Sequence, residues 1–178
     1  MKDARFITRT ALFAALTAVL SQISFPVPFS PVPFSLGLTG VLLSGGLLDK
    51  KQAAASQAAF ILVGLTGIPV FAGFRGGVAA ALGPTGGYLL AYPFMAWSVA
   101  YLREKVPKNT GVTFASMLPA LALCYAFGSI WLAASAGMSL WAAVCAGVLP
   151  YAAFDVIKLG AAAFLITEIE KRTTFIRR

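Results

Sequence analysis

Two oppositely charged side chains, Asp155 and Lys158, lie in an otherwise apolar stretch of a chain that contains no histidine. They are three residues apart, and Tyr151 precedes Asp155 by four, so all three would share one face of a helix. Arg75 is a further isolated charge, in a separate glycine-rich segment. Carboxylate, ammonium and guanidinium groups supply the few polar contacts that orient a small molecule in an apolar site. These residues therefore form our candidate site.

The composition is that of a membrane protein. Of the 178 residues, 59% are hydrophobic and only 11% are charged, with a mean hydropathy of +0.84, whereas about 25% would be charged in a soluble domain. Six spans of about 20 residues would use about 120 residues, which leaves no room for a soluble catalytic domain. We predict an all-α membrane protein in which residues 1–178 form a single transmembrane substrate-binding domain with six transmembrane helices.

Prolines, glycines and short charged turns separate the predicted spans. Residues 25–34 read FPVPFSPVPF and cannot be helical, because four prolines recur within eight residues. Residues 67–88 are rich in glycine and contain two prolines, which favours a structured loop rather than a lipid-facing helix. The six spans expected on this basis are residues 4–24, 35–48, 53–68, 86–102, 111–136 and 140–169.

Basic residues predict the orientation in the membrane. Twelve of the 14 lysines and arginines lie at the two termini, at residues 50–51 and at residues 103–108, while the alternate connections hold only Arg75. By the positive-inside rule both termini are cytoplasmic, and the loops after the first and third spans face outward. This pattern accounts for the net charge of +8 without nucleic acid as a partner. Asp155 would then lie about 20 Å from the cytoplasmic end of its helix, in the outer half of the membrane.

The charged pair has two interpretations. Asp155 and Lys158 would neutralise each other in a purely structural pair, since an unpaired charge near the bilayer centre costs about 2.5–3.5 kcal/mol on insertion scales. That interpretation leaves the two unusual outward loops unexplained. A small-molecule cavity beneath those loops accounts for all of these features. An enzyme is disfavoured, because the spans hold one carboxylate and no metal-ligand set, whereas a scaffold or channel subunit stays open.

The segments GIPVFAGFRGG (residues 67–77) and LGPTGGYLLAYP (residues 82–93), followed by Asp155 and Lys158, resemble the BioY family. Members of this family are the biotin-specific S components of energy-coupling factor (ECF) transporters. The similarity covers essentially the whole chain, including the loop at residues 25–34. It implies a multi-pass subunit of a bacterial cytoplasmic membrane that captures biotin from outside, with no enzyme activity and no cofactor. The resemblance also implies partners, because most members work with a transmembrane coupling subunit and two ATP-binding cassette ATPases.

The resemblance also implies roles for individual residues. Asp155 would accept a hydrogen bond from a ureido N–H of biotin, Lys158 would donate to the ureido carbonyl, and Arg75 would face the valerate carboxylate. The reverse orientation of biotin is an alternative arrangement, and a different small vitamin-like solute is the alternative ligand. Aromatic side chains are expected to pack against the rings of biotin, and backbone N–H groups are expected to donate further hydrogen bonds. The aromatic residues are Phe71, Phe74, Tyr88 and Tyr151, and the backbone donors are Thr85, Gly86 and Gly87.

A stripe of small residues on the first span, Ala11, Ala14, Ala15 and Ala18, is a candidate contact surface. Its spacing suits close packing of helices, either within the chain or against a partner. The BioY family has an alanine-rich motif in the first helix, so the resemblance favours the partner-binding role.

Overall fold

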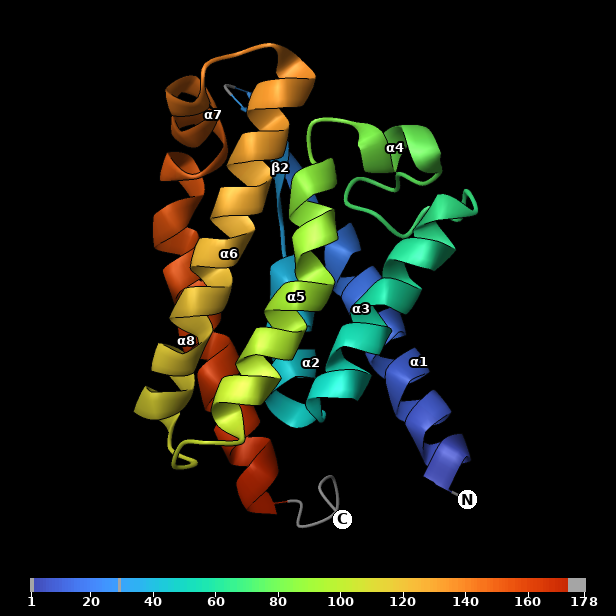
Figure 1. Cartoon of the computed structure of the whole chain (residues 1–178), viewed down its shortest axis with the longest axis vertical. Coiled ribbons are helices and arrows are strands. Elements are labelled where there is room, and N and C mark those ends of the chain that lie inside the picture. The colour runs from blue at the N-terminus through green and yellow to red at the C-terminus, as the bar shows by residue number, and fades with distance from the viewer. Residues whose placement is uncertain (1, 29, 173–178) are drawn as a thin grey trace.

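The computed structural model describes residues 2–28 and 30–172, and most of them are helical (Figure 1). Within these residues, eight helices are joined by short connections, and one antiparallel hairpin follows the first helix. In chain order the elements are α1 (Lys2–Gln22), β1 (Ser24–Val27), β2 (Ser30–Ser35), α2 (Gly37–Leu47), α3 (Lys50–Leu65), α4 (Val78–Leu82), α5 (Gly86–Arg103), α6 (Thr110–Ala136), α7 (Leu140–Gly147) and α8 (Leu149–Arg172).

Three of the described helices are long and apolar enough to cross a membrane. They are Ala4–Gln22 within α1, then α6 and α8, and they correspond to the first, fifth and sixth predicted spans. The other predicted spans correspond to α2, α3 and α5, which have 11, 16 and 18 residues. The chain is therefore a largely helical membrane protein.

The short helix α2 forms the centre of the bundle. Ten of its 11 residues are buried, and its glycines allow neighbouring helices to approach closely. A Cβ atom added at Gly46 would lie 2.1 Å from Ile166 of α8, and one added at Gly45 would lie 2.8 Å from Val99 of α5. Small residues at such contacts let helix backbones pack tightly, so α2 is enclosed by its neighbours.

The segment predicted as a loop at residues 25–34 is a β-hairpin, so the all-α prediction is wrong at this point. Ser24 pairs with Ser35, and Phe25 pairs with Phe34 across the two strands. The two phenylalanine rings stack with their centroids 4.7 Å apart. Proline is tolerated here because each strand of a two-stranded ribbon has a free edge that requires no N–H donor.

The sixth predicted span is interrupted. Helix α7 ends at Gly147 and α8 begins at Leu149, with Val148 between them at φ −124° and ψ −58°. Pro150 then stands in the first turn of α8, where its missing N–H is not needed. The single helix predicted over residues 140–169 is therefore wrong, and the break places a short helix beside the hairpin.

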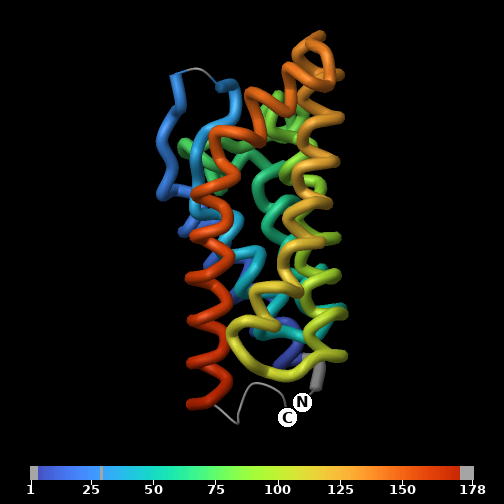
Figure 2. Tube along the Cα trace, turned by 90° about the vertical axis from the view of Figure 1, so that its left-hand side faces the viewer, coloured from blue at the N-terminus to red at the C-terminus, as the bar shows by residue number. Residues whose placement is uncertain are grey.

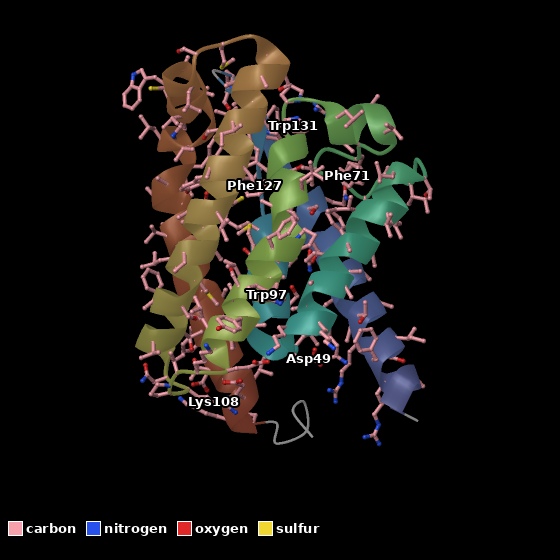
Figure 3. All side chains as sticks on the ribbon, viewed as in Figure 1. Asp49, Phe71, Trp97, Lys108, Phe127 and Trp131 are labelled. Atoms are coloured by element: carbon pink, nitrogen blue, oxygen red, sulfur yellow. The ribbon has the colours of Figure 1, made fainter. Side chains whose placement is uncertain are left out.

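The basic segments gather at one end of the molecule. The beginning of α1 and the end of α8 lie at the same end of the molecule in both views (Figures 1 and 2). Figure 3 places Asp49 and Lys108, at the two short charged turns, at the same end. The hairpin, α4 and α7 lie at the opposite end. This arrangement of charge agrees with the sidedness inferred from the sequence.

Candidate functional site

Asp155 and Lys158 form a buried ion pair that is tied to two other elements. Lys158 Nζ lies 2.9 Å from Asp155 Oδ1, and the two residues are 8% and 5% exposed. Lys158 also donates to the main-chain carbonyl of Ser35 in β2 at 2.8 Å, and it lies 4.0 Å from the centroid of the Phe34 ring. The hydroxyl of Tyr125 in α6 donates to Asp155 Oδ2 at 2.8 Å. The pair is therefore held in a fixed orientation by α6 and the hairpin.

Tyr151 lies on the same face of α8, as its spacing from Asp155 predicts. Its side chain is buried, and its hydroxyl donates to the main-chain carbonyl of Val32 in β2. With the bond from Lys158 to Ser35, this gives α8 two hydrogen bonds to the backbone of the hairpin. The hairpin thus covers the face of α8 that carries the charged pair.

Two adjoining cavities lie beneath the hairpin and share five lining residues, Val32, Pro33, Ser35, Tyr88 and Tyr92. The first cavity is lined by the charged pair and, from α6, by Cys124 and Tyr125. The second is bounded by the segment between α3 and α5. The remaining lining residues are Leu38, Cys124, Tyr125, Gly147, Tyr151, Asp155 and Lys158 in the first cavity, and Ser21, Phe71, Ala72, Arg75, Ala80, Thr85 and Leu89 in the second.

The loop around Arg75 is a tight turn closed by main-chain hydrogen bonds. The N–H of Phe71 donates to the carbonyl of Arg75 at 2.9 Å, and the reverse bond measures 3.2 Å. Phe71 is 3% exposed and packs edge-on against Phe60, so it is both core and cavity wall. Phe74, at φ +56°, is 70% exposed and lines neither of these cavities. The structure thus brings Arg75 and Phe71 to the site but leaves Phe74 outside it.

The glycines of the GPTGGY segment hold the start of α5 against α6. A Cβ atom added at Gly87 would lie 2.2 Å from the Cβ of Trp131, and one at Gly86 would lie 2.8 Å from its indole nitrogen. That nitrogen donates to the carbonyl of Gly83 at 2.9 Å, and the N–H of Gly86 donates to the same carbonyl. Gly86 and Gly87 therefore pack on Trp131 and line neither cavity, whereas Thr85 lines the second.

Tyr88 links three helices at the site. Its hydroxyl donates to the carbonyl of Gly147, at the break between α7 and α8, at 3.0 Å. Its ring lies against Gly128 of α6, where an added Cβ would be 2.1 Å from the ring. The absence of a side chain at Gly128 therefore makes room for this wall of both cavities.

Gly128→Ala is expected to destabilise the protein by about 1–3 kcal/mol, because the ring of Tyr88 would have to move. Gly160→Ala is the matched control, since a Cβ at Gly160 meets nothing within 4 Å and alanine is the better helix former. Thermal unfolding in detergent measures both changes. Equal stability of the two variants would contradict the packing described for Tyr88.

The family model described as the BioY family matches residues 1–175. This chain belongs to the BioY family. It is 37% identical over 173 residues to the probable biotin transporter BioY of Pyrococcus horikoshii, covering 97% of this chain and 93% of that protein. It is 35% identical over 167 residues to the biotin transporter BioY of Thermotoga maritima, covering 94% and 96%.

A solved structure has the same fold as this BioY family member. It is the crystal structure of the S-component for biotin from an ECF-type ABC transporter, at a TM-score of 0.90 and 27% sequence identity. The alignment covers 98% of this chain and 95% of that one. The family and the fold make the chain a transporter component rather than an enzyme.

Several lining residues of this BioY family member were missed from the sequence. Tyr125 carries a signal in retrospect, because it is the one tyrosine in a long apolar span. Tyr92, Cys124 and Leu38 carry none, since they resemble ordinary packing residues. The carbonyl of Ser35 is main chain, and its role depends on the hairpin, which the sequence did not reveal.

The alanine stripe lies on the surface of the bundle. Ala11, Ala14, Ala15 and Ala18 line an apolar groove together with α3 residues that include Ala59 and Val63. The membrane-length segment of α1 is only 17% buried, compared with 39% for those of α6 and α8. The stripe therefore packs in part against α3, and it also lines a groove that stays open at the surface.

Proposed function

We propose that this BioY family chain takes up biotin, as the membrane subunit that captures biotin on the outer side and moves it across the membrane. The observation that carries the proposal is the buried ion pair of Asp155 and Lys158 in the wall of an aromatic cavity. The names of the relatives and the structural match to a biotin S-component support the same ligand. A cavity with a few convergent polar groups is the usual form of a small-molecule site.

The proposed contacts match the chemistry of biotin. Its ureido group has two N–H donors and one carbonyl acceptor, which would meet Asp155 and Lys158. Each carboxylate oxygen has two acceptor sites and an ammonium group has three donors, so both residues keep bonding capacity beyond Tyr125 and Ser35. Arg75, which lines the second cavity, would hold the valerate carboxylate.

The apolar rings of biotin would lie between aromatic walls. Tyr88 borders both cavities, Phe71 and Thr85 border the one near Arg75, and Tyr151 borders the one near the ion pair. Phe74, Gly86 and Gly87 have no contact in this proposal, because they lie outside both cavities. A ligand that lacks the ureido group would leave the buried pair without its partners and would be rejected.

The proposed topology has six transmembrane helices in one domain of residues 1–178, multi-pass in a bacterial cytoplasmic membrane. Helices α1, α2, α3, α5, α6 and α8 would be the spans, with α7 as a cap on the outer side. Support comes from the gathering of the basic segments at the end that would be cytoplasmic (Figure 2). The hairpin and the turn around Arg75 would then face the outside.

The alanine groove is the proposed docking surface for a transmembrane coupling subunit, which would act with ATP-binding cassette ATPases. Ala15→Trp would fill the groove and is expected to reduce copurification with the coupling subunit at least tenfold, while biotin binding stays unchanged. Leu12→Trp is the matched control, because Leu12 is 62% exposed on the same helix but does not line the groove. Equal copurification of the two variants would contradict this role.

Uptake of radiolabelled biotin by a biotin-auxotrophic bacterium tests the function. Cells that express the chain with an ECF module are expected to accumulate biotin, and excess unlabelled biotin should compete whereas thiamine should not. Expression without the module measures how far transport depends on partners. Uptake no higher than that of cells carrying an empty vector would refute the proposal.

A further inference from the structure

An aromatic stripe runs along the outer face of α5 toward the end that carries the basic segments. Phe94 and Trp97 are 57% and 44% exposed, and Phe94 stacks on Phe127 of α6. Figure 3 shows Trp97 and Phe127 on the same face of the bundle. Tyr101, one helical turn beyond Trp97, stacks on it with the centroids 5.1 Å apart and the planes 7° apart. The stripe thus passes from lipid-facing phenylalanine to the amphipathic rings typical of a membrane interface.

Two lysines from different elements converge on the last ring of this stripe. Lys105 Nζ lies 4.1 Å from the centroid of the Tyr101 ring and donates to its hydroxyl. Lys50, the first residue of α3, lies 5.8 Å from the same centroid and pairs with Glu104 at 3.1 Å. Each of these ammonium groups has three donors, and the hydrogen bonds to Glu104 and to the Tyr101 hydroxyl use one donor each, which leaves donors for a further anion.

The charge of this corner remains positive after its own carboxylates are counted. The two turns contain the basic residues Lys50, Lys51, Arg103, Lys105 and Lys108 and the acidic residues Asp49 and Glu104. Arg103 is buried and paired with Glu170, so the lysines outnumber the carboxylates of the turns. The carboxylate of Asp49 accepts from the N–H groups of Lys51 and Gln52 and caps α3, so it is directed into the helix end. One carboxylate, that of Glu104, is therefore directed at the converging lysines.

We propose that this corner binds an anionic phospholipid of the cytoplasmic leaflet, with its phosphate at Lys50 and Lys105 and its acyl chains along Trp97 and Phe94. The depth and sidedness of the site rest on the proposed topology. Charge complementarity selects the lipid, because a zwitterionic headgroup carries its own cation and gains less from two lysines. Each interfacial lysine contributes about 1 kcal/mol to anionic lipid binding, or roughly fivefold, so two predict a preference of about 25-fold.

Fluorescence quenching by brominated lipids tests the proposal on the full chain in detergent. The fluorescence of Trp97 is obtained as the difference between the original protein and the Trp97→Phe variant. Brominated phosphatidylglycerol is expected to quench it at about 25-fold lower concentration than brominated phosphatidylcholine. The double variant K50Q/K105Q should lose this preference, whereas K108Q/K171Q, which removes the same charge from other exposed positions, should retain it.

Equal quenching of Trp97 by the two lipids would overturn the proposal and make this face an ordinary lipid-facing surface. So would an unchanged preference in K50Q/K105Q. Displacement of the lipid by glycerol phosphate at equal concentration would show a site for phosphate rather than for a lipid, and would also overturn it. Biotin binding, measured on the same samples, should be unaffected in K50Q/K105Q. Absence of biotin binding with an intact lipid preference would refute the proposed function alone.

Discussion

Asp155→Asn is expected to lower the affinity for biotin by about 10- to 150-fold. The substitution removes one charge from the ion pair but keeps the size of the side chain, and the amide oxygen still accepts from Tyr125. Hydrogen bonds to charged groups contribute about 1.5–3 kcal/mol, which converts to this range. Retention of radiolabelled biotin by the purified variant measures the change.

Tyr125→Phe provides the comparison for this result. It removes the hydroxyl that donates to Asp155 Oδ2 but leaves the charged pair in place. We expect a smaller loss of affinity than for Asp155→Asn, because the hydroxyl orients the carboxylate, which keeps its charge and its proposed contact with biotin. Biotin affinity within twofold of the original protein in Asp155→Asn would exclude Asp155 from the binding site.

Glu170→Ala is expected to destabilise the protein by about 3–5 kcal/mol, as for other broken buried ion pairs. Arg103, at the end of α5, is 1% exposed, and its Nη2 lies 2.5 Å from Glu170 Oε2 of α8. Arg103 also donates to the hydroxyl of Thr113 in α6. Loss of Glu170 would leave a buried cation without its carboxylate. Chemical unfolding followed by circular dichroism measures the loss.

Glu168→Ala is the matched control on the same helix. Its partner Lys171 is 64% exposed, so this surface pair should contribute no more than about 1 kcal/mol. The double variant Arg103→Met with Glu170→Ala should recover most of the lost stability, because no buried charge remains. Similar losses in Glu168→Ala and Glu170→Ala would contradict the account of Arg103.

The long helices and the polar face of α8 were predictable because both depend on local spacing. Hydropathy over about 20 residues predicts α1, α6 and α8, and the i, i+3 and i+4 rule predicts that Tyr151, Asp155 and Lys158 share a face. The positions of lysine and arginine predict which helix ends lie on the same side of the membrane. None of these inferences requires knowledge of contacts between distant segments.

The hairpin and the glycine contacts depend on tertiary structure and could not be predicted in this way. Four prolines exclude a helix at residues 25–34, but proline is also depleted in strands, so the pairing of Phe25 with Phe34 had no local signal. Gly87 was predicted as a backbone donor to the ligand, and no role was predicted for Gly128. Their main effect is to make room for Trp131 and Tyr88, which lie in other helices.

Calorimetric titration of biotin into the purified chain, with biotin amide alongside, tests whether the cavities beneath the hairpin bind biotin. We expect saturable binding near one biotin per chain and weaker binding of the amide, which lacks the carboxylate assigned to Arg75. Equal affinity for the amide would remove Arg75 from the site. Absence of heat and of thermal stabilisation at high biotin concentration would contradict the claim that this cavity binds biotin.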